Sequence, residues 1–157
     1  MRAALLLLLV ATTAHADSKF TIKDNRLELP SPIAFATGSA KLTSDSDAAL
    51  DHAKAYLAEK SYITTLRIEN HTDEPDQQAL SDARALAVAK ALVAKGVECG
   101  RLLPVGFGNT KPVVANDTPA HRAQNRRTEL ANAALRGHPI GGLPIDGGGH
   151  VAGDPCK

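Results

Sequence analysis

An aspartate and an arginine at a strand–helix junction are the residues of this chain best suited to binding chemistry. Asp73 follows residues 66–71, where apolar and polar side chains alternate with the period of a half-buried strand. Arg84 lies in the helix predicted next, four residues from Leu80 and four from Val88, on the apolar stripe of that helix. An arginine on a buried face needs an anionic partner, because a buried unpaired charge costs several kcal/mol.

Two interpretations of this pair follow from the residue types. A carboxylate at a strand end can hold an ammonium group, and a guanidinium can bind a carboxylate through two parallel hydrogen bonds, so the pair suits a zwitterionic ligand. Alternatively, Asp73 and Arg84 form an ion pair with each other that only positions the helix. Both interpretations stay open at this level.

The segments around this pair alternate between strand and helix patterns. A strand pattern at residues 19–29 turns at Asp24-Asn25, and an apolar stripe of residues 80, 83, 87, 88, 91 and 92 marks the helix that Pro75-Asp76 opens and Gly96 ends. The remaining predicted elements are an extended segment at 33–35, a helix at 43–59, a strand at 102–107, a short helix at 119–125 and a strand at 127–131. This order predicts an α/β (α+β) sandwich in which helices cover one side of a small mixed sheet.

Composition predicts an exported protein with one domain. Residues 1–16 resemble a secretory signal, with Arg2 before an apolar run and a small-x-small site ending at Ala16. We expect a hairpin at residues 17–32, a domain at 33–133 and a tail at 134–157, with the mature chain in the periplasm. The apolar run is too short to span a membrane, which predicts no spanning segment. Because Arg2 is one of the 18 basic residues, the mature chain would carry 17 against 17 acidic ones, which does not favour nucleic acid as a partner.

The chain has two cysteines, which allow a single intramolecular pairing. Cys156 lies in the glycine- and proline-rich tail, which has no apolar periodicity of its own and cannot fold alone. A disulfide to Cys99 would hold this tail against the domain. Two free thiols are the alternative, although an oxidising compartment favours the bond.

Four stretches together resemble a known family, the OmpA-like C-terminal domain that binds peptidoglycan. They are residues 33–42 (IAFATGSAKL), 68–73 (IENHTD), 80–85 (LSDARA) and 106–127, which includes Asn125-Arg126-Arg127. The resemblance spans about residues 33–132. It implies a βαβαβ arrangement and non-covalent binding of the diaminopimelate residue in the stem peptide of the cell wall.

The resemblance also implies roles for single residues. The aspartate of the family falls on Asp73 and would receive the diaminopimelate ammonium, and its arginine falls on Arg84 and would pair with the carboxylate. Secondary contributions are expected from Thr37, Asn70, Thr72, Asn125 and Arg127. For Asn125 and Arg127 the alternative is hydrogen bonding that only fixes a loop.

Other functions stay open beside wall binding. The loop at residues 74–78 is shorter than is usual in the family, so a periplasmic interaction protein that kept the fold but lost or altered wall binding is the alternative. An outer-membrane or envelope protein is a possible partner. His71 and Asp73 flank Thr72 and invite an acid–base or metal interpretation, but no third ligand joins them at strand or helix spacing. We therefore expect no catalytic residues, no metal and no cofactor.

Overall fold

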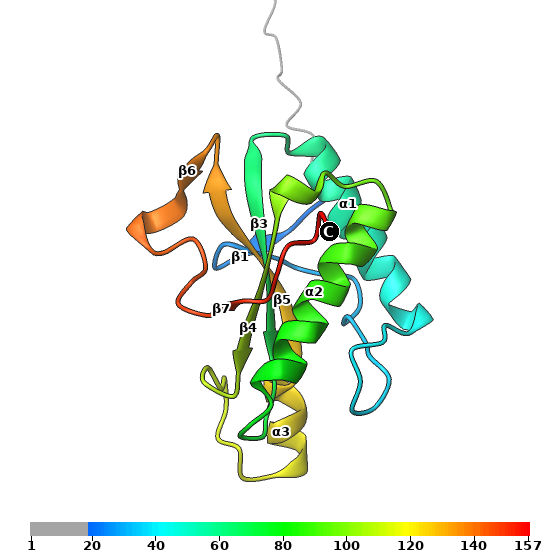
Figure 1. Ribbon diagram of the computed structural model, residues 1–157, viewed down its shortest axis with the longest axis vertical. Coiled ribbons are helices and arrows are strands. Elements are labelled where there is room, and N and C mark those ends of the chain that lie inside the picture. The colour runs from blue at the N-terminus through cyan, green and yellow to red at the C-terminus, as the bar shows by residue number, and fades with distance from the viewer. Residues whose placement is uncertain (1–18) are drawn as a thin grey trace, which may run out of the picture.

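The computed structural model describes residues 19–157, as a mixed sheet with helices packed on it (Figure 1). The predicted signal segment at residues 1–16 lies outside the described residues. The sheet has seven strands in the order β1-β2-β5-β3-β4-β7, and β6 pairs with β5. In chain order the elements are β1 (Ile22–Lys23), β2 (Arg26–Leu27), η1 (Ser44–Ser46), α1 (Asp47–Glu59), β3 (Ile63–His71), α2 (Gln78–Ala94), η2 (Cys99–Arg101), β4 (Leu102–Gly108), α3 (Pro119–Asn125), β5 (Arg127–Leu135), β6 (His138–Pro139), η3 (Ile140–Gly142) and β7 (His150–Val151).

The centre of the sheet matches the predicted fold class. Strand β3 pairs in parallel with β4 and antiparallel with β5, so the sheet is mixed. Helix α2 packs on β3 and β4, and α1 lies beside α2 on the same face (Figure 1). The α/β sandwich with helices on one side of the sheet is confirmed.

The buried face of α2 differs from the predicted stripe. The residues that α2 buries are Ser81, Ala85, Val88, Ala89 and Leu92. Ala83 is exposed, and Arg84 lies at the flank of the buried face. Because this helix carries alanine on every side, apolar periodicity marks its inner face poorly. The polar Ser81 is buried because its hydroxyl donates to the Asn70 carbonyl at 2.7 Å and accepts from the Gly108 amide at 3.0 Å.

Glycines fix the end of α2 and its distance from the sheet. Gly96 has φ +96° and lies just past the helix, as predicted, and the Val97 amide bonds the Leu92 carbonyl across it at 3.0 Å. Gly106 in β4 faces α2 closely, since a Cβ there would lie 2.8 Å from the Asp82 backbone nitrogen. The helix therefore rests almost on the β4 backbone.

Several element boundaries differ from prediction. Strand β3 begins at Ile63, before the predicted residue 66, and β5 continues past the predicted residue 131 to Leu135. The predicted helix at 43–59 is divided into η1 and α1, and α2 begins at Gln78 because Asp76 has φ +61°. The extra residues of β5 lack alternation: Asn132 is buried and accepts a hydrogen bond from the Tyr56 hydroxyl at 3.0 Å.

The tail lies across the sheet face that the helices leave open. The predicted disulfide between Cys99 and Cys156 is confirmed. Strand β7 pairs with the edge of β4, and the Ile145 carbonyl accepts a hydrogen bond from Arg67 at 2.9 Å. At Gly149 a Cβ would lie 2.8 Å from ring carbons of Phe107, so the tail backbone covers that ring closely. Within residues 19–157, no helix has the length and apolar character needed to cross a membrane.

Candidate functional site

A cavity of about 530 Å³ opens where β3 and α3 end and the segment after β2 passes. Residues from the segment 33–38 form one wall, and the end of β3 forms another. Its lining consists of Ile33, Ala34, Phe35, Thr37, Gly38, Asn70, His71, Arg84, Arg126, Arg127 and Thr128. Three arginines, Arg84, Arg126 and Arg127, belong to this lining, and arginine suits an anionic group of a ligand.

Arg84 lines this cavity without a carboxylate partner among residues 19–157. Its Nε donates to the Ser39 carbonyl at 2.9 Å, and its guanidinium carbon lies 5.0 Å from the centre of the Phe35 ring. Burial lowers the pKa of Arg84, the charge of Arg126 lowers it further, and Asp73 acts in the opposite direction. A partly desolvated cation held by a neutral carbonyl and a ring can accept a carboxylate.

Asp73 forms an ion pair with Arg126 and not with Arg84, the arginine considered from the sequence. Its Oδ2 lies 2.7 Å from Nη1 of Arg126, and its side chain is 6% exposed while that of Arg126 is 45% exposed. The Asn116 amide donates to the Asp73 backbone carbonyl, which fixes the strand end. Asp73 is absent from the cavity lining, whereas Arg126 belongs to it. The alternative of an Asp73–Arg84 ion pair is therefore not what this structure contains.

The secondary residues divide into cavity and framework positions. Thr37, Asn70 and Arg127 line the cavity. Asn70 donates from Nδ2 to the Thr128 hydroxyl at 2.8 Å, while its buried Oδ1 has no hydrogen-bond partner. Thr72 is buried outside the cavity lining, and its backbone amide donates to the Gly108 carbonyl at 2.8 Å.

Asn125 is a framework residue in this structure. Its Oδ1 accepts from the Val113 amide at 2.9 Å and its Nδ2 donates to the Val114 carbonyl at 3.0 Å. A further bond joins Nδ2 to Oδ1 of Asn116 at 3.0 Å. With 1% of its surface exposed, Asn125 fixes the loop before α3, which is the alternative considered for it in the sequence.

Sequence reasoning missed the roles of Phe35 and Arg126. Both lie in stretches that carry the family resemblance, but neither was expected to touch the site. Arg126 reaches Asp73 because residue 126 is the C-cap of α3, at the junction with β5. Only the pairing of β5 with β3, which sets His71 opposite Arg127, brings that junction to the end of β3. No local signal in the sequence reports this register.

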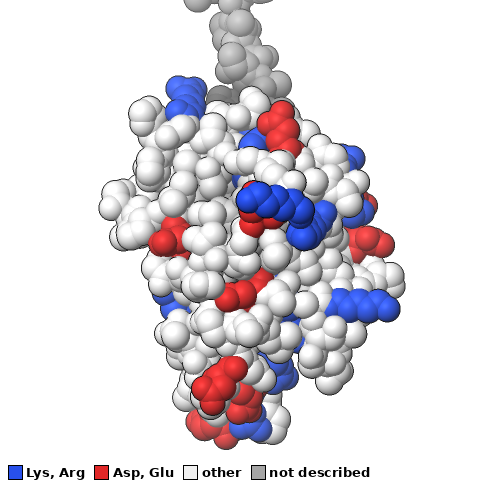
Figure 2. Space-filling model, in the orientation of Figure 1, with Lys and Arg blue, Asp and Glu red and all other residues white. Residues whose placement is uncertain are grey.

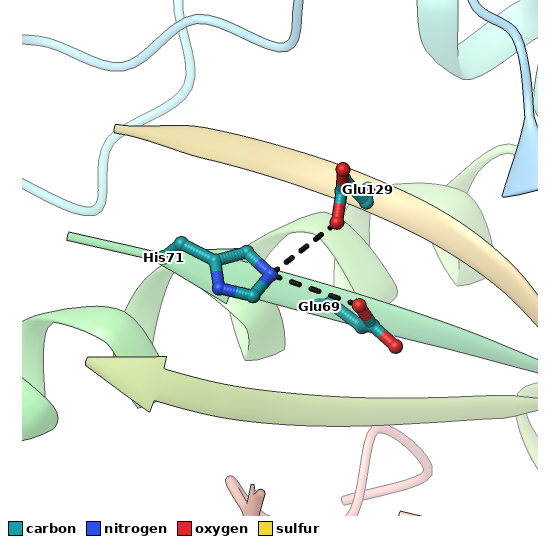
Figure 3. Close-up of side chains that lie close together, drawn as sticks. All are labelled: Glu69, His71 and Glu129. Carbon is teal, nitrogen blue, oxygen red and sulfur yellow. Dashed lines mark ion pairs between the residues drawn. The ribbon is translucent and has the colours of Figure 1, made fainter. Parts of the chain in front are cut away.

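A second cluster of titratable groups lies on the sheet face opposite the helices (Figure 3). His71 and Glu69 from β3 and Glu129 from β5 bring one ligand atom each within 4.8 Å of one another. The His71 Nε2 lies 3.6 Å from Glu69 and 3.5 Å from Glu129, and its ring stacks on Phe107 with centroids 5.0 Å apart. From the sequence, His71 was grouped with Asp73 because of their spacing. The pairing of Glu129 with Glu69 depends on how β5 aligns with β3, which the sequence does not report.

Arginines already neutralise the two carboxylates of this cluster. Arg26 lies 2.8 Å from Glu69 and 3.1 Å from Glu129, Arg67 lies 2.5 Å from Glu69, and Arg127 lies 3.2 Å from Glu129. Burial alone would raise the pKa of Glu69, but His71, Arg67 and Arg26 outweigh it and lower the pKa to about 2.

The same balance holds at the second carboxylate. Burial would raise the pKa of Glu129, yet His71, Arg127 and Arg26 lower it to about 2. A divalent cation would have to compete with Arg26 for both carboxylates. The cluster therefore acts as an ion-pair network that joins β2, β3 and β5.

The face of the molecule drawn in Figure 2 carries charges of both signs. Figure 2 shows acidic and basic side chains interspersed over the face in view. This pattern agrees with the formal net charge of +1. A net charge this small gives no strong overall field that would attract a highly charged partner.

Comparisons with known proteins agree with this fold. The model of the OmpA family matches residues 34–126. The chain is 31% identical over 112 residues to the probable lipoprotein YiaD of Escherichia coli, a match that covers 69% of this chain and 51% of YiaD. It is 34% identical over 103 residues to the peptidoglycan-binding protein ArfA of Mycobacterium tuberculosis, covering 63% of this chain and 31% of ArfA.

A solved structure also resembles this fold. The peptidoglycan-associated lipoprotein of Burkholderia pseudomallei superposes with a TM-score of 0.57 at 30% identity, covering 64% of this chain and 88% of that one. The chain thus spans about half the length of YiaD and a smaller share of ArfA, so it corresponds to one part of those relatives. The family match covers more than half of the described fold, including both Asp73 and Arg84. The chain belongs to the OmpA family.

Proposed function

We propose that this protein binds peptidoglycan non-covalently in the cell envelope, and that it does so through the diaminopimelate residue of the stem peptide. Two relatives support the general part of this proposal, because one is named peptidoglycan-binding and another peptidoglycan-associated. We also propose a periplasmic location after cleavage near Ala16, because residues 1–16 resemble a secretory signal. An outer-membrane or envelope protein is the partner that would connect this domain to a membrane.

The observation that carries the proposal is the state of Arg84. Its guanidinium lines the cavity, is partly desolvated and has no carboxylate partner in the described part of the chain. A carboxylate of diaminopimelate would supply the missing charge through charge-assisted hydrogen bonds. In this proposal the Asp73 carboxylate receives the ammonium on the same stereocentre.

A second feature supports a ligand with donor groups. The buried Oδ1 of Asn70 lacks a hydrogen-bond partner although Asn70 lines the cavity. Buried acceptors are nearly always satisfied by protein groups or by ordered water, and in this proposal a donor group of the ligand serves Oδ1. Ammonium and peptide N–H groups of a stem peptide both provide one.

Co-sedimentation with cell-wall sacculi tests the proposal. We expect wild-type protein to pellet with sacculi of the diaminopimelate type, and excess free meso-diaminopimelate to release it. Arg84→Gln should bind about ten- to a hundredfold more weakly, which is the effect of losing a charge-assisted pair. Asp73→Asn should also weaken binding.

Arg122→Gln is the matched control, since Arg122 lies on α3 outside the cavity lining and should leave binding unchanged. The urea midpoint of Arg84→Gln should stay close to wild type, because no buried carboxylate loses its partner. If folded wild type does not pellet, or if free diaminopimelate does not compete, the alternative of an envelope interaction protein with altered wall binding gains support. The short loop at residues 74–78 and the Arg126–Asp73 pair are the features that favour this alternative.

A further inference from the structure

Arg126 occupies the place at Asp73 that a ligand cation would need. The two side chains form an ion pair of 2.7 Å, and Arg126, not Asp73, contributes to the cavity wall. An ammonium that approaches from the cavity therefore meets a guanidinium before it reaches the carboxylate. A carboxylate can be shared by two cations only if they tolerate their mutual repulsion.

The charge balance of the cavity makes such sharing unfavourable. Arg84 and Arg126 are close enough for the charge of Arg126 to lower the pKa of Arg84, and Asp73 is the acidic group that offsets them. The wall of the cavity therefore carries an excess of positive charge. A ligand ammonium would add another cation to this group, whereas a ligand carboxylate would reduce the repulsion.

The two partners of the ion pair differ in how firmly they are held. Asp73 is 6% exposed, and its backbone carbonyl accepts a hydrogen bond from Asn116. Arg126 is 45% exposed, and Asp73 is the only side chain within residues 19–157 with which it forms an ion pair. If the pair opens, the arginine side chain is the one free to move into solvent, and the carboxylate stays at the strand end.

We propose that Arg126 is an internal cation that a zwitterionic ligand must displace from Asp73, and that Arg126 thereby sets the selectivity of the site. This inference rests on the proposed function and assigns a role to a residue outside the predicted ligand set. A ligand that carries only carboxylates can bind Arg84 while the Arg126–Asp73 pair stays closed. A ligand that carries an ammonium next to the carboxylate binds only after Arg126 leaves.

Two ligands that differ only in their amines can distinguish binding that requires Arg126 to leave Asp73 from binding that does not. Meso-diaminopimelate and pimelate have the same seven-carbon dicarboxylate chain, and pimelate lacks both amines. Calorimetric titration of Arg126→Met should show meso-diaminopimelate binding about fivefold tighter than to wild type, which corresponds to an ion pair of roughly 1 kcal/mol. Pimelate should bind Arg126→Met no more tightly than wild type, because its binding never required the pair to open.

Arg122→Met is the matched control on the same helix, and it should change neither affinity. A measurement on the wild type keeps the test independent of the variant's folding. In NMR spectra that detect arginine side chains, the Arg126 Nη–H signals should show faster exchange with water on saturation with meso-diaminopimelate and no such change with pimelate, because Nη1 is the nitrogen that donates to Asp73.

The outcomes distinguish this inference from the proposed function. If wild type binds meso-diaminopimelate but Arg126→Met binds it equally or more weakly, Arg126 is a ligand-contacting residue or a bystander, and the inference is overturned while the proposed function stands. An Arg126 signal that is unchanged in the saturated wild type would overturn it in the same way. If neither wild type nor Arg126→Met binds meso-diaminopimelate, the proposed function fails, and the inference fails with it.

Discussion

At the scale of single residues, the arginines of this domain differ in what they neutralise. Arg26 and Arg67 hold the carboxylate of Glu69, which is 1% exposed, and Arg126 holds that of Asp73. Among residues 19–157, the partners of the Arg84 guanidinium are a backbone carbonyl and an aromatic ring, and neither is charged. The paired arginines stabilise buried acids that the fold cannot leave unpaired, whereas in the proposed function the charge of Arg84 serves the ligand.

The buried acids predict how stability depends on pH. In the folded protein the pKa values of Glu69 and Glu129 are about 2, below the usual value of 4.5. Because folding lowers these pKa values, the stabilisation is fully present above about pH 5 and is lost as the pH falls toward 2. We expect the free energy of unfolding, from urea titrations, to fall by a few kcal/mol over this window.

The variant Glu69→Gln tests whether this ion-pair network, and not the protonation of acidic residues elsewhere, makes the stability sensitive to acid. The variant should be less stable than wild type at pH 7, because Arg67 and Arg26 lose their common partner, and its stability should depend less steeply on pH below 5. If the free energy of unfolding falls with pH equally steeply in the variant and in the wild type, Glu69 is not a source of the acid sensitivity.

At the scale of elements, the placement of α2 on the sheet depends on small and polar contacts. Gly106 lets the helix approach β4, and the Ser81 hydroxyl joins the Asn70 carbonyl of β3 to the Gly108 amide of β4. Arg84 projects from this helix one turn after Ser81. The position of the candidate ligand group is therefore set by the same contacts that hold the helix.

Ser81→Ala should destabilise the fold by about 1–3 kcal/mol, since a buried amide and a buried carbonyl would lose a partner. The midpoint of urea unfolding measures this effect. Ala83→Ser places a hydroxyl on the exposed side of the same helix and should change stability by less than about 0.5 kcal/mol. A destabilisation of similar size in both variants would argue against the role of the Ser81 hydrogen bonds.

Much of this architecture could be predicted from local patterns, and the failures have physical causes. Alternation identified β3, the core strand predicted at 102–107 is β4, and the short helix predicted at 119–125 matches the bounds of α3. The stripe of α2 was misplaced because alanine is tolerated on any face. Asp73 and Arg84 stood out by charge, but the ion pair of Asp73 with Arg126 depends on strand register, which the residues near Asp73 do not encode.

At the scale of the whole molecule, the tail completes a face of the sheet that the helices leave uncovered. The Cys99–Cys156 disulfide joins the tail to the segment before β4 across a sequence separation of 57 residues. Strand β7 then pairs with β4, and Gly149 lies against Val105 and Phe107. The stacked ring of His71 belongs to this covered face, so the tail also shields the ion-pair network.

The disulfide should contribute about 4 kcal/mol to the free energy of unfolding, by the loop-closure relation for a loop of this length. We expect the Cys99→Ser/Cys156→Ser variant to unfold at clearly lower urea concentration than the oxidised wild type, with faster hydrogen exchange at β7. Reduction of wild type should reproduce both effects. Unchanged protection of β7 in the variant would show that strand pairing alone holds the tail.

In the proposed function, Arg84 binds the carboxylate that distinguishes diaminopimelate from lysine. The most direct test is calorimetric titration of wild type and Arg84→Gln with two stem tripeptides that differ only in carrying meso-diaminopimelate or lysine at the third position. We expect wild type to bind the diaminopimelate peptide with about tenfold or more higher affinity than the lysine peptide. Arg84→Gln should bind both peptides weakly and with equal affinity. Equal affinity of wild type for the two peptides, or a preference that survives in Arg84→Gln, would contradict this role of Arg84.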